Sequence, residues 1–387
     1  MSRIKVLSLF GTRPEAIKMV PVLKALEQEA LIQSVVCLSG QHREMLQQVL
    51  CAFAVNAQFN LDIMKPSQTI TTITSGVLEG MEKIFRQEAP DLLLVHGDTT
   101  TAFAGALAGF YAQVAVGHVE AGLRTYDKYS PYPEEMNRCL ITRLCDLHFA
   151  PTCANKQNLA KEAAQGQVFV TGNTVIDALK MTVQKEYSFQ NPTLNTLDFQ
   201  AGRVLLVTAH RRENLGAPLR GICRAIRRIA EENPDVQIVY PVHLNPAVRE
   251  VAKEILGGCA RIYLTDPLDV FDMHNLMERC YLVMTDSGGL QEEAPALGKP
   301  VLVLRTETER PEAVEYGTVR MAGIDPETIC RMANELLSSP QAYMQMAKAV
   351  NPYGDGKAAK RIVDAILYHF GKGPRPEEFQ VEQRGKA

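Results

Sequence analysis

The sequence predicts an α/β protein with two doubly wound parallel sheets, one in each half of the chain. The chain has 387 residues, of which 46% are hydrophobic, and domains of roughly 100–200 residues are typical, so two are expected. Short apolar runs alternate with helix-like segments in both halves, as in parallel sheets that are buried on both faces. A polar stretch at residues 187–202 separates the two series, and it is predicted to be an interdomain linker.

In the first half, strands are predicted where apolar residues run almost continuously. These runs are Ile4–Phe10, Ile32–Leu38, Asp91–His96, Val114–Val119 and Leu147–Ala150. Amphipathic helices are predicted between them, at Pro14–Glu29, Thr69–Gln87 and Thr99–Gln113. Residues 1–186 therefore form the first predicted domain.

The same alternation restarts after the polar stretch and predicts a second domain at residues 203–355. Its predicted strands are Val204–Ala209, Val236–Pro241, Arg261–Leu264, Tyr281–Thr285 and Pro300–Leu304. The last amphipathic segment, 356–370, is predicted to be a helix that crosses back and completes the first domain.

Composition narrows the function classes. The formal net charge is −3, which gives no general attraction to nucleic acid or to an anionic membrane. The nine cysteines include no CxxC pair, so a reducing compartment is expected rather than a disulfide framework. The chain opens on an apolar strand without the cleavage region of a signal peptide, and no apolar run is long enough to span a bilayer. These features predict a cytoplasmic protein.

Ligands of doubly wound sheets bind beyond the carboxyl ends of the strands, so the residues found there are the candidate site. The first strand runs into Gly11–Glu15. Thr12 can cap the following helix, while Arg13 and Lys18 would hold an anion at its start. The alternative is an ordinary capped helix with solvated basic residues.

Three carboxylates follow other strands of the first domain. Asp98 comes after the strand that ends at His96, and Glu120 comes after the strand that ends at Val119. Asp98 can instead be a helix cap, whereas burial would raise the pKa of Glu120 and suit it to proton transfer. Glu134 and Glu135 open a helix after two prolines, and one of them is expected only to complement the helix dipole.

The second domain has polar clusters at matching places. His210 follows its first strand and can be an acid, a base or a phosphate donor, or a structural histidine. Ser287, Gly288 and Gly289 join a strand to a helix and can offer donors to a diphosphate. Glu292 and Glu293 lie one turn further on, where a carboxylate can accept from ribose hydroxyls, and Arg310 is expected near the same surface.

Together these motifs resemble the non-hydrolysing UDP-N-acetylglucosamine 2-epimerases over almost the whole chain. The resemblance rests on GTRPEAIKM, HGDTTTA, HVEAGLRT, PEEMNR, TGNTVIDAL, TAHRREN, PVHLNP, DSGGLQEEAPALGKPVLVLR and TERPEAV. It implies a GT-B fold, two Rossmann-like domains around a nucleotide-sugar cleft, with no cofactor and with a homodimer. It also implies a catalytic set, which is Asp98, Glu120, Glu134 and His210.

The resemblance further implies binding residues for UDP-N-acetylglucosamine (UDP-GlcNAc). Ser287, Gly288 and Gly289 would face the diphosphate, Glu293 the ribose, and Arg310 the phosphates or sugar. Arg13 and Lys18 would reach the ligand from the first domain, and Phe271 or Met273 would lie near the uracil. Some family members bind a second UDP-GlcNAc as an activator, and the matching residues are Gln41, His42, Gln68, Arg211 and His243. Ser67 departs from the basic residue often found there, which predicts weakened or absent regulation.

The predicted reaction inverts carbon 2 and gives UDP-N-acetylmannosamine (UDP-ManNAc). No GxGxxG motif indicates a bound nicotinamide, so elimination and readdition of UDP is the predicted route. The rival hypotheses are a GT-B glycosyltransferase, a hydrolysing epimerase that releases free sugar, an epimerase of a modified acetamido sugar, and a catalytically silent nucleotide-sugar sensor.

Overall fold

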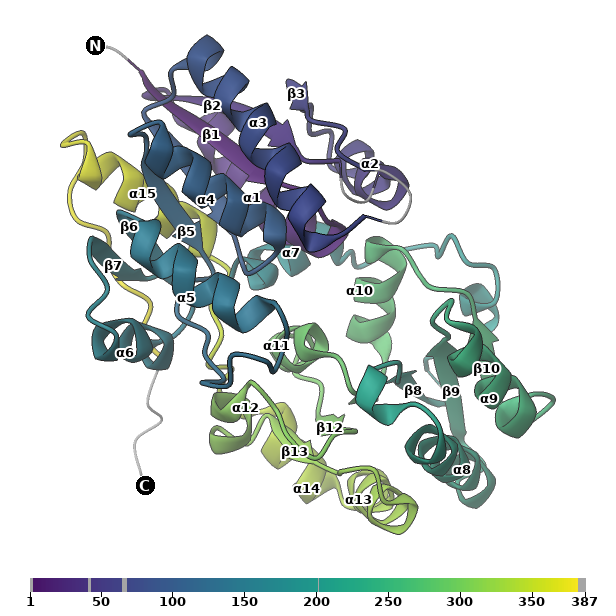
Figure 1. The fold of residues 1–387 in the computed structure, drawn as a ribbon. Helices are drawn as coiled ribbons and strands as arrows, with labels where there is room; N and C mark the ends of the chain where they lie inside the picture. Colours follow the sequence, from purple (N-terminus) through teal and green to yellow (C-terminus); the bar gives the residue numbers. More distant parts are fainter. Residues whose placement is uncertain (1–2, 41–42, 65–67, 201, 382–387) are drawn as a thin grey trace. The chain divides into compact units, whose positions relative to one another are not determined.

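The computed structural model describes residues 3–40, 43–64, 68–200 and 202–381, which fall into two compact α/β units. Unit 1 comprises the chain up to Met181 together with Tyr353–Gln380, and unit 2 comprises Thr182–Pro352. Each unit is a parallel sheet with helices on both faces (Figure 1). This confirms the predicted fold class. Among the described residues, no helix is both long and apolar enough to cross a membrane.

The sheet of unit 1 has the strand order β3-β2-β1-β4-β5-β6-β7. Its strands are β1 (Ile4–Phe10), β2 (Ile32–Leu38), β3 (Phe59–Asn60), β4 (Leu92–His96), β5 (Ala115–Val119), β6 (Leu147–Ala150) and β7 (Gln167–Val170). Because the order reverses direction between β1 and β4, the carboxyl ends of these two strands mark the position where ligands of such sheets bind.

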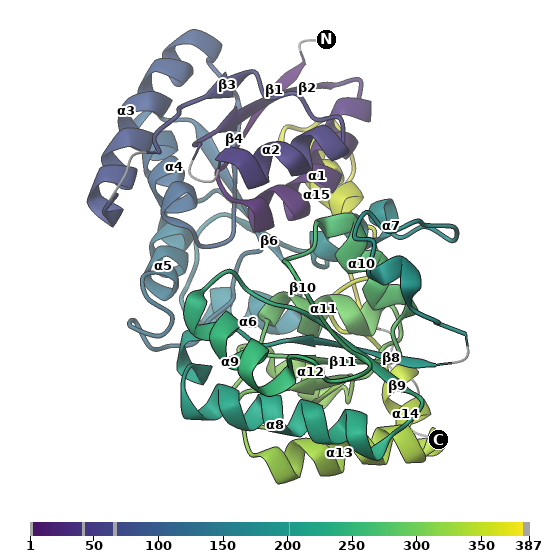
Figure 2. The same ribbon diagram turned by 90° about the vertical axis from the view of Figure 1, so that its right-hand side faces the viewer.

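The helices of unit 1 cover both faces of that sheet. They are α1 (Arg13–Gln28), α2 (Arg43–Ala52), α3 (Ile70–Glu88), α4 (Thr100–Tyr111), α5 (Glu134–Leu144), α6 (Cys153–Lys161), α7 (Thr174–Thr182) and α15 (Ala358–His369). Figure 2 shows α15 beside α1, although the two are far apart in the sequence. The core is apolar on both sides of the sheet, with Leu7 and Leu9 of β1 fully buried on one face and Val6 and Phe10 fully buried on the other, as parallel strands require.

The sheet of unit 2 repeats this plan with the order β10-β9-β8-β11-β12-β13. Its strands are β8 (Arg203–Thr208), β9 (Val236–Pro241), β10 (Ile262–Thr265), β11 (Leu282–Thr285), β12 (Val301–Val303) and β13 (Val319–Met321). Its helices are α8 (Ala217–Glu232), α9 (Pro246–Leu256), α10 (Val270–Arg279), α11 (Gly288–Ala296), α12 (Pro311–Glu315), α13 (Pro326–Ser338) and α14 (Pro340–Ala347), with short 3-10 turns at Leu194–Thr196 and Arg212–Asn214. The direction reverses between β8 and β11, which places His210 and Ser287 at the ligand-binding edge.

The described residues of the stretch 187–202, predicted to be a linker, are instead packed as part of unit 2. The buried carboxylate of Asp272 on α10 accepts hydrogen bonds from the Tyr187 hydroxyl (2.9 Å) and from the backbone N–H groups of Gln190 (2.9 Å) and Asn191 (2.8 Å). The polar composition of the stretch is typical of a linker. Its backbone donors, however, bind a residue some eighty positions later in the chain, and no local sequence pattern indicates such a partner.

A side chain of α7 holds the return helix α15 in unit 1. The carboxylate of Asp177 accepts hydrogen bonds from the backbone N–H groups of Ala358 (3.1 Å) and Ala359 (3.0 Å), the first residues of α15. The residue before α15, Lys357, makes no side-chain cap. Asp177 therefore acts as the cap of a helix that lies far away in the sequence.

Replacing Asp177 by alanine is expected to lower the free energy of unfolding by about 1–2 kcal/mol, the effect of losing a helix cap. The first turn of α15 should also exchange its amide hydrogens faster, which hydrogen-exchange mass spectrometry of peptides covering Ala358–His369 would measure. Asp364→Ala is the matched control, because the Asp364 side chain in the same helix is partly exposed and, among the described residues, pairs with Lys360 alone. Equal effects of the two variants would contradict the capping role.

Candidate active site

Glu120 lies at the centre of the candidate site in unit 1, directly after β5. Its Oε1 atom is hydrogen-bonded to the Lys18 ammonium group of α1 and to the Asn173 amide (3.0 Å), and its Oε2 atom lies 3.7 Å from His96 Nε2. The side chain of Glu120 is only 9% exposed. A buried carboxylate held by one cation and one amide is a suitable proton acceptor.

The backbone of Glu120 adopts an unusual conformation that aims this side chain. Its φ angle is +66°, in the left-handed region that residues other than glycine rarely adopt. Two residues later, Gly122 has a φ of +91°, and a Cβ atom there would lie 2.4 Å from the Asn155 carbonyl oxygen. The turn therefore needs glycine at this position, and it carries strain at Glu120 of the kind found at functional sites.

Asp98 is held by an ion pair rather than used as a helix cap. Arg138 of α5 contacts Asp98 Oδ2 through Nε (2.9 Å) and Nη2 (2.7 Å), and the Asn137 amide donates to the Asp98 carbonyl (2.8 Å). The helix that follows Asp98 is capped by Thr99 instead, whose hydroxyl accepts from the Ala102 N–H. The capping alternative for Asp98 is therefore wrong.

The two glutamates that open α5 differ in role. Glu135 is 2% exposed; it accepts from the Tyr126 backbone N–H (2.9 Å) and pairs with Arg138 (3.0 Å), so its role is structural. Glu134 is half-buried, and its carboxylate makes no hydrogen bond or ion pair with any residue that the structure describes. Of this pair, Glu134 is the one available to a ligand.

The start of α1 is a capped helix. Thr12 and Glu15 form a reciprocal capping box, which confirms the predicted capped helix, and burial raises the pKa of Glu15 although several hydrogen bonds oppose this. Lys18, however, is not a solvated basic residue, since its side chain is 13% exposed and pairs with Glu120. Arg13 is half-buried at the first position of the helix.

In unit 2, His210 lies after β8 beside a fully buried carboxylate. Asp286 Oδ2 accepts from the backbone N–H groups of His210 (2.7 Å) and Arg211 (2.8 Å) and from the Asn214 amide (3.0 Å). Asp286 Oδ1 lies 3.5 Å from His210 Nδ1. Burial lowers the pKa of His210, and Asp286 offsets part of this effect. The His210 ring also stacks on the exposed His243 ring, with centroids 5.2 Å apart.

The start of α11 faces Arg310. Ser287 is the residue before the helix, and its side chain does not cap the helix. Among the contacts described, its hydroxyl is therefore available to bind a ligand. A Cβ atom on Gly288 would lie 2.8 Å from Arg310 Nη1, so glycine is needed for the guanidinium group to approach the backbone this closely. A helix start next to an arginine is a site for a phosphate or another anion.

Arg310 is itself held by two carboxylates. Its Nε donates to Glu292 (2.9 Å) and its Nη1 to Glu309 (3.3 Å). Burial by itself would raise the pKa of Glu309, but Arg305 and Arg310 lower it to about 2, so Glu309 is ionised. Of the two glutamates considered for the ribose, Glu292 is 1% exposed and paired with Arg310. Glu293 Oε1 borders the first turn of α11, since a Cβ atom on Gly289 would lie 3.2 Å from it.

The remaining predicted residues lie as follows. Met273 and Phe271 are half-buried on α10. Gln68, in unit 1, donates its amide to the Ile63 carbonyl, while Arg211 and His243 belong to unit 2, where both flank His210. Gln41, His42 and Ser67 lie outside the described residues.

Four residues of the site were not among the predicted ones: His96, Arg138, Asn173 and Asp286. All four lie inside quoted motifs, so membership of those motifs was an available signal. Their roles depend on contacts with residues 24 to 76 positions away, which the local pattern does not reveal.

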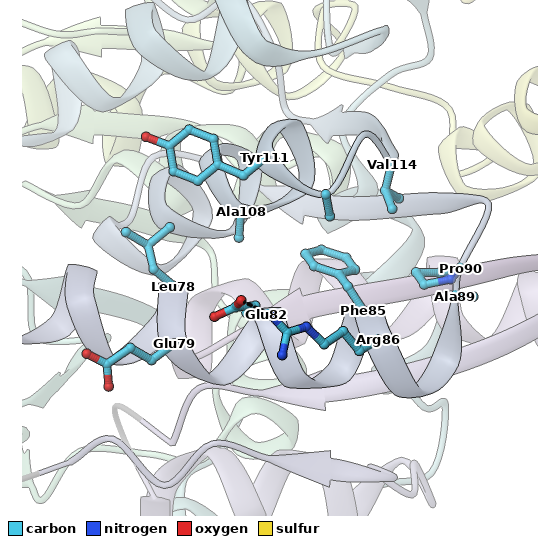
Figure 3. Close-up of a pocket in the computed structure, with 11 residues that line it drawn as sticks. Leu78, Glu79, Glu82, Phe85, Arg86, Ala89, Pro90, Ala108, Tyr111 and Val114 are labelled. Carbon is cyan, nitrogen blue, oxygen red and sulfur yellow. Dashed lines mark hydrogen bonds and ion pairs between the residues drawn. The ribbon is translucent and has the colours of Figure 1, made fainter.

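Two surface cavities contain none of the predicted residues. One, of about 720 Å³, lies where Leu78 and Phe85 of α3 extend toward Ala108 of α4 (Figure 3), and its Glu82 pairs with Arg86.

Comparison with known proteins agrees with this architecture. A UDP-N-acetylglucosamine 2-epimerase of Bacillus subtilis is 53% identical over 381 residues, covering 98% of this chain and 99% of that protein. S. aureus MnaA, solved with UDP, is 50% identical with a TM-score of 0.89, covering 97% of this chain and all of that one. The UDP-GlcNAc 2-epimerase of Neisseria meningitidis, solved bound to UDP-GlcNAc, is 46% identical with a TM-score of 0.86, covering 94% of this chain and all of that one.

Two Rossmann-like units with polar clusters at their strand ends place this protein among the enzymes of GT-B fold. The sequence model of the UDP-N-acetylglucosamine 2-epimerase family matches residues 24–367. The chain therefore belongs to the UDP-N-acetylglucosamine 2-epimerase family, and it is an isomerase.

Proposed function

We propose that the protein interconverts UDP-GlcNAc and UDP-ManNAc by elimination and readdition of UDP, through a 2-acetamidoglucal intermediate. The observation that carries the proposal is the buried Glu120 carboxylate, hydrogen-bonded to Lys18 and Asn173 at the carboxyl end of β5. In this scheme, a base removes the C2 proton while the C1–O bond to UDP breaks, which forms the C1=C2 double bond. A proton then returns to C2 on the opposite face, and a UDP oxygen re-forms the bond to C1.

The elimination needs an acid and a base on opposite faces of the sugar. Glu120 and Asp98 support this requirement because their surroundings differ. Glu120 is nearly buried beside a lysine, while the side chain of Asp98 is 27% exposed and paired with Arg138. Glu134, half-buried at the start of α5, is proposed as the third member of the set.

The leaving UDP needs groups that stabilise the negative charge developing on its diphosphate. The start of α11 and the guanidinium group of Arg310 support this role, since both offer N–H donors at one place in unit 2. Glu293 is proposed to accept from the ribose hydroxyls and Met273 to lie near the uracil. His210 is proposed to contact the diphosphate or to protonate it as it leaves. Arg13, in unit 1, is proposed to bind the substrate.

Incubation with UDP-GlcNAc in deuterated water, followed by NMR, tests the proposal. We expect UDP-ManNAc that carries deuterium at C2, with UDP still attached at equilibrium. Free N-acetylmannosamine would identify the hydrolysing reaction instead. Release of UDP only after an acceptor is added would identify a glycosyltransferase, and the absence of C2 exchange would contradict the proposal. Running the assay in parallel with modified UDP-acetamido sugars would show which substrate the protein prefers.

We also propose that the protein is a cytoplasmic homodimer and that its product supplies cell-surface polysaccharide synthesis. Exposed aromatic side chains on α4, Phe110 (58%) and Tyr111 (68%), support self-association. Sedimentation equilibrium measures the dimer directly.

We propose that activation by a second UDP-GlcNAc is weakened or absent, because Ser67 replaces the basic residue often found at that position. UDP-GlcNAc added to a reaction started from UDP-ManNAc should then not increase its initial rate, and a clear increase would show that the activation is retained.

A further inference from the structure

His96 has an unusual environment for a buried polar side chain. It is the last residue of β4 and is 3% exposed, and neither ring nitrogen has a hydrogen-bond partner among the described residues. Buried polar groups nearly always have such partners, so the exception calls for a reason. His96 shares its strand end with Asp98 and lies beside Glu120, which points to a role in the active site.

The geometry directs the ring toward Glu120. His96 Nε2 is 3.7 Å from Glu120 Oε2, while Lys18 and Asn173 bond to the other oxygen of the same carboxylate. This separation is longer than a hydrogen bond. Catalytic hydrogen bonds are often long in the absence of substrate and shorten in the complex, and a small rotation of the carboxylate would close this one.

His96 is a neutral imidazole at pH 7. Burial lowers its pKa to about 4, although Glu120 and Asp98 oppose this effect, and Lys18 adds to it. His118 is a further titratable group that interacts with His96, and burial lowers its pKa to about 3. A neutral ring carries one proton, and a buried N–H without an acceptor is rarer than a lone pair without a donor. Neither nitrogen has an acceptor within hydrogen-bond distance among the described residues, but Nε2 faces the Glu120 carboxylate oxygen at 3.7 Å. We therefore assign the proton to Nε2.

We propose that His96 is a positioning residue that donates its Nε2–H to Glu120 Oε2 and fixes the plane of the carboxylate together with Lys18 and Asn173. The inference rests on the proposed function, because it assigns Glu120 to proton transfer at C2. A donor to the charged form of a carboxylate favours that form. His96 therefore keeps Glu120 ionised and aimed, ready to accept the proton.

Two substitutions test this role in the kinetics. His96→Leu removes the donor at similar volume, and we expect kcat to fall about 10–100-fold, the effect of losing a hydrogen bond to a charged group. We expect KM to stay within about twofold, because a ring that is 3% exposed acts by positioning Glu120 rather than by binding substrate. The acidic limb of the kcat–pH profile should move up by about one unit, since the carboxylate loses a donor. His96→Gln supplies an amide donor and should restore both values. An unmoved acidic limb in His96→Leu, or no rescue by glutamine, overturns the inference.

A readout without turnover separates this inference from the proposed function. In the folded protein labelled with 15N-histidine, the His96 signal is assigned among the eight histidines by its absence in His96→Gln. We expect the Nε2–H tautomer from about pH 5.5 to 8, and a shift of this signal in Glu120→Gln. The Nδ1–H tautomer, or a signal that Glu120→Gln leaves unchanged, overturns the inference even if wild-type protein exchanges deuterium at C2. Failure of that exchange in wild type would instead count against the proposed function.

Discussion

Replacing Glu120 by glutamine lowers kcat about 10²–10⁴-fold, the range for loss of a general acid–base group, and leaves the Kd for UDP within about twofold because the proposed UDP contacts are in unit 2. Glutamine retains an oxygen that can accept from Lys18 and Asn173, but it cannot accept a proton at neutral pH. Steady-state kinetics and calorimetric titration with UDP measure the two effects.

A matched control is Glu82→Gln, a surface change on α3 of the same unit, where Glu82 is 63% exposed and pairs only with Arg86 among the contacts described. It should leave turnover unchanged. A Glu120→Gln protein with near wild-type turnover would remove Glu120 from the mechanism. Loss of UDP binding together with turnover would indicate that Glu120 is a structural residue instead.

Replacing Asp286 by alanine lowers the free energy of unfolding of unit 2 by about 3–5 kcal/mol, because three donors lose their acceptor and each buried unsatisfied donor costs about 1–3 kcal/mol. The substitution leaves two backbone N–H groups, of His210 and Arg211, and the Asn214 amide without their acceptor in a buried place. The loop carrying His210 would lose its anchor, so turnover should fall as well. Asp286→Asn retains an acceptor oxygen and should be intermediate in stability.

Urea unfolding followed by circular dichroism measures this effect, since the chain contains no tryptophan to serve as a fluorescent probe. The unfolding should be analysed for two transitions because the chain forms two compact units. Asp266→Ala is the control, because the Asp266 side chain is 80% exposed and its loss should change stability by less than about 1 kcal/mol. Equal stability of Asp286→Ala and Asp266→Ala would show that the Asp286 network is not important for folding.

The strands were predictable because parallel strands buried on both faces are nearly continuous apolar runs. The runs predicted at Ile4–Phe10, Ile32–Leu38 and Val236–Pro241 have the bounds of β1, β2 and β9. The edge strands β3, β7 and β13 were not predicted. They have two, four and three residues, and their pairing depends on the neighbouring strand more than on their own composition.

The site was predictable to the level of the strand ends, because a parallel sheet brings all its carboxyl ends to one edge. That argument singled out Asp98, Glu120, His210 and Ser287 before any contact was known. It could not distinguish Glu134 from Glu135, since adjacent residues of a helix start look alike in sequence. Only Arg138 and the Tyr126 N–H, which both bond to Glu135, show that this glutamate is committed to the structure.

The sequence by itself determined the two α/β units and the chemical groups at their strand ends, because apolar periodicity and chain order are properties of neighbouring residues. The tertiary structure decided which of those groups are paired. The partners in these contacts lie 18 to 102 residues apart in the sequence. The contacts are those of Lys18 with Glu120, Arg138 with Asp98, Arg310 with Glu292, and the buried ring of His96 with Glu120. Contacts at such distances arise only when the sheet has assembled, and they set the charge and orientation of each carboxylate.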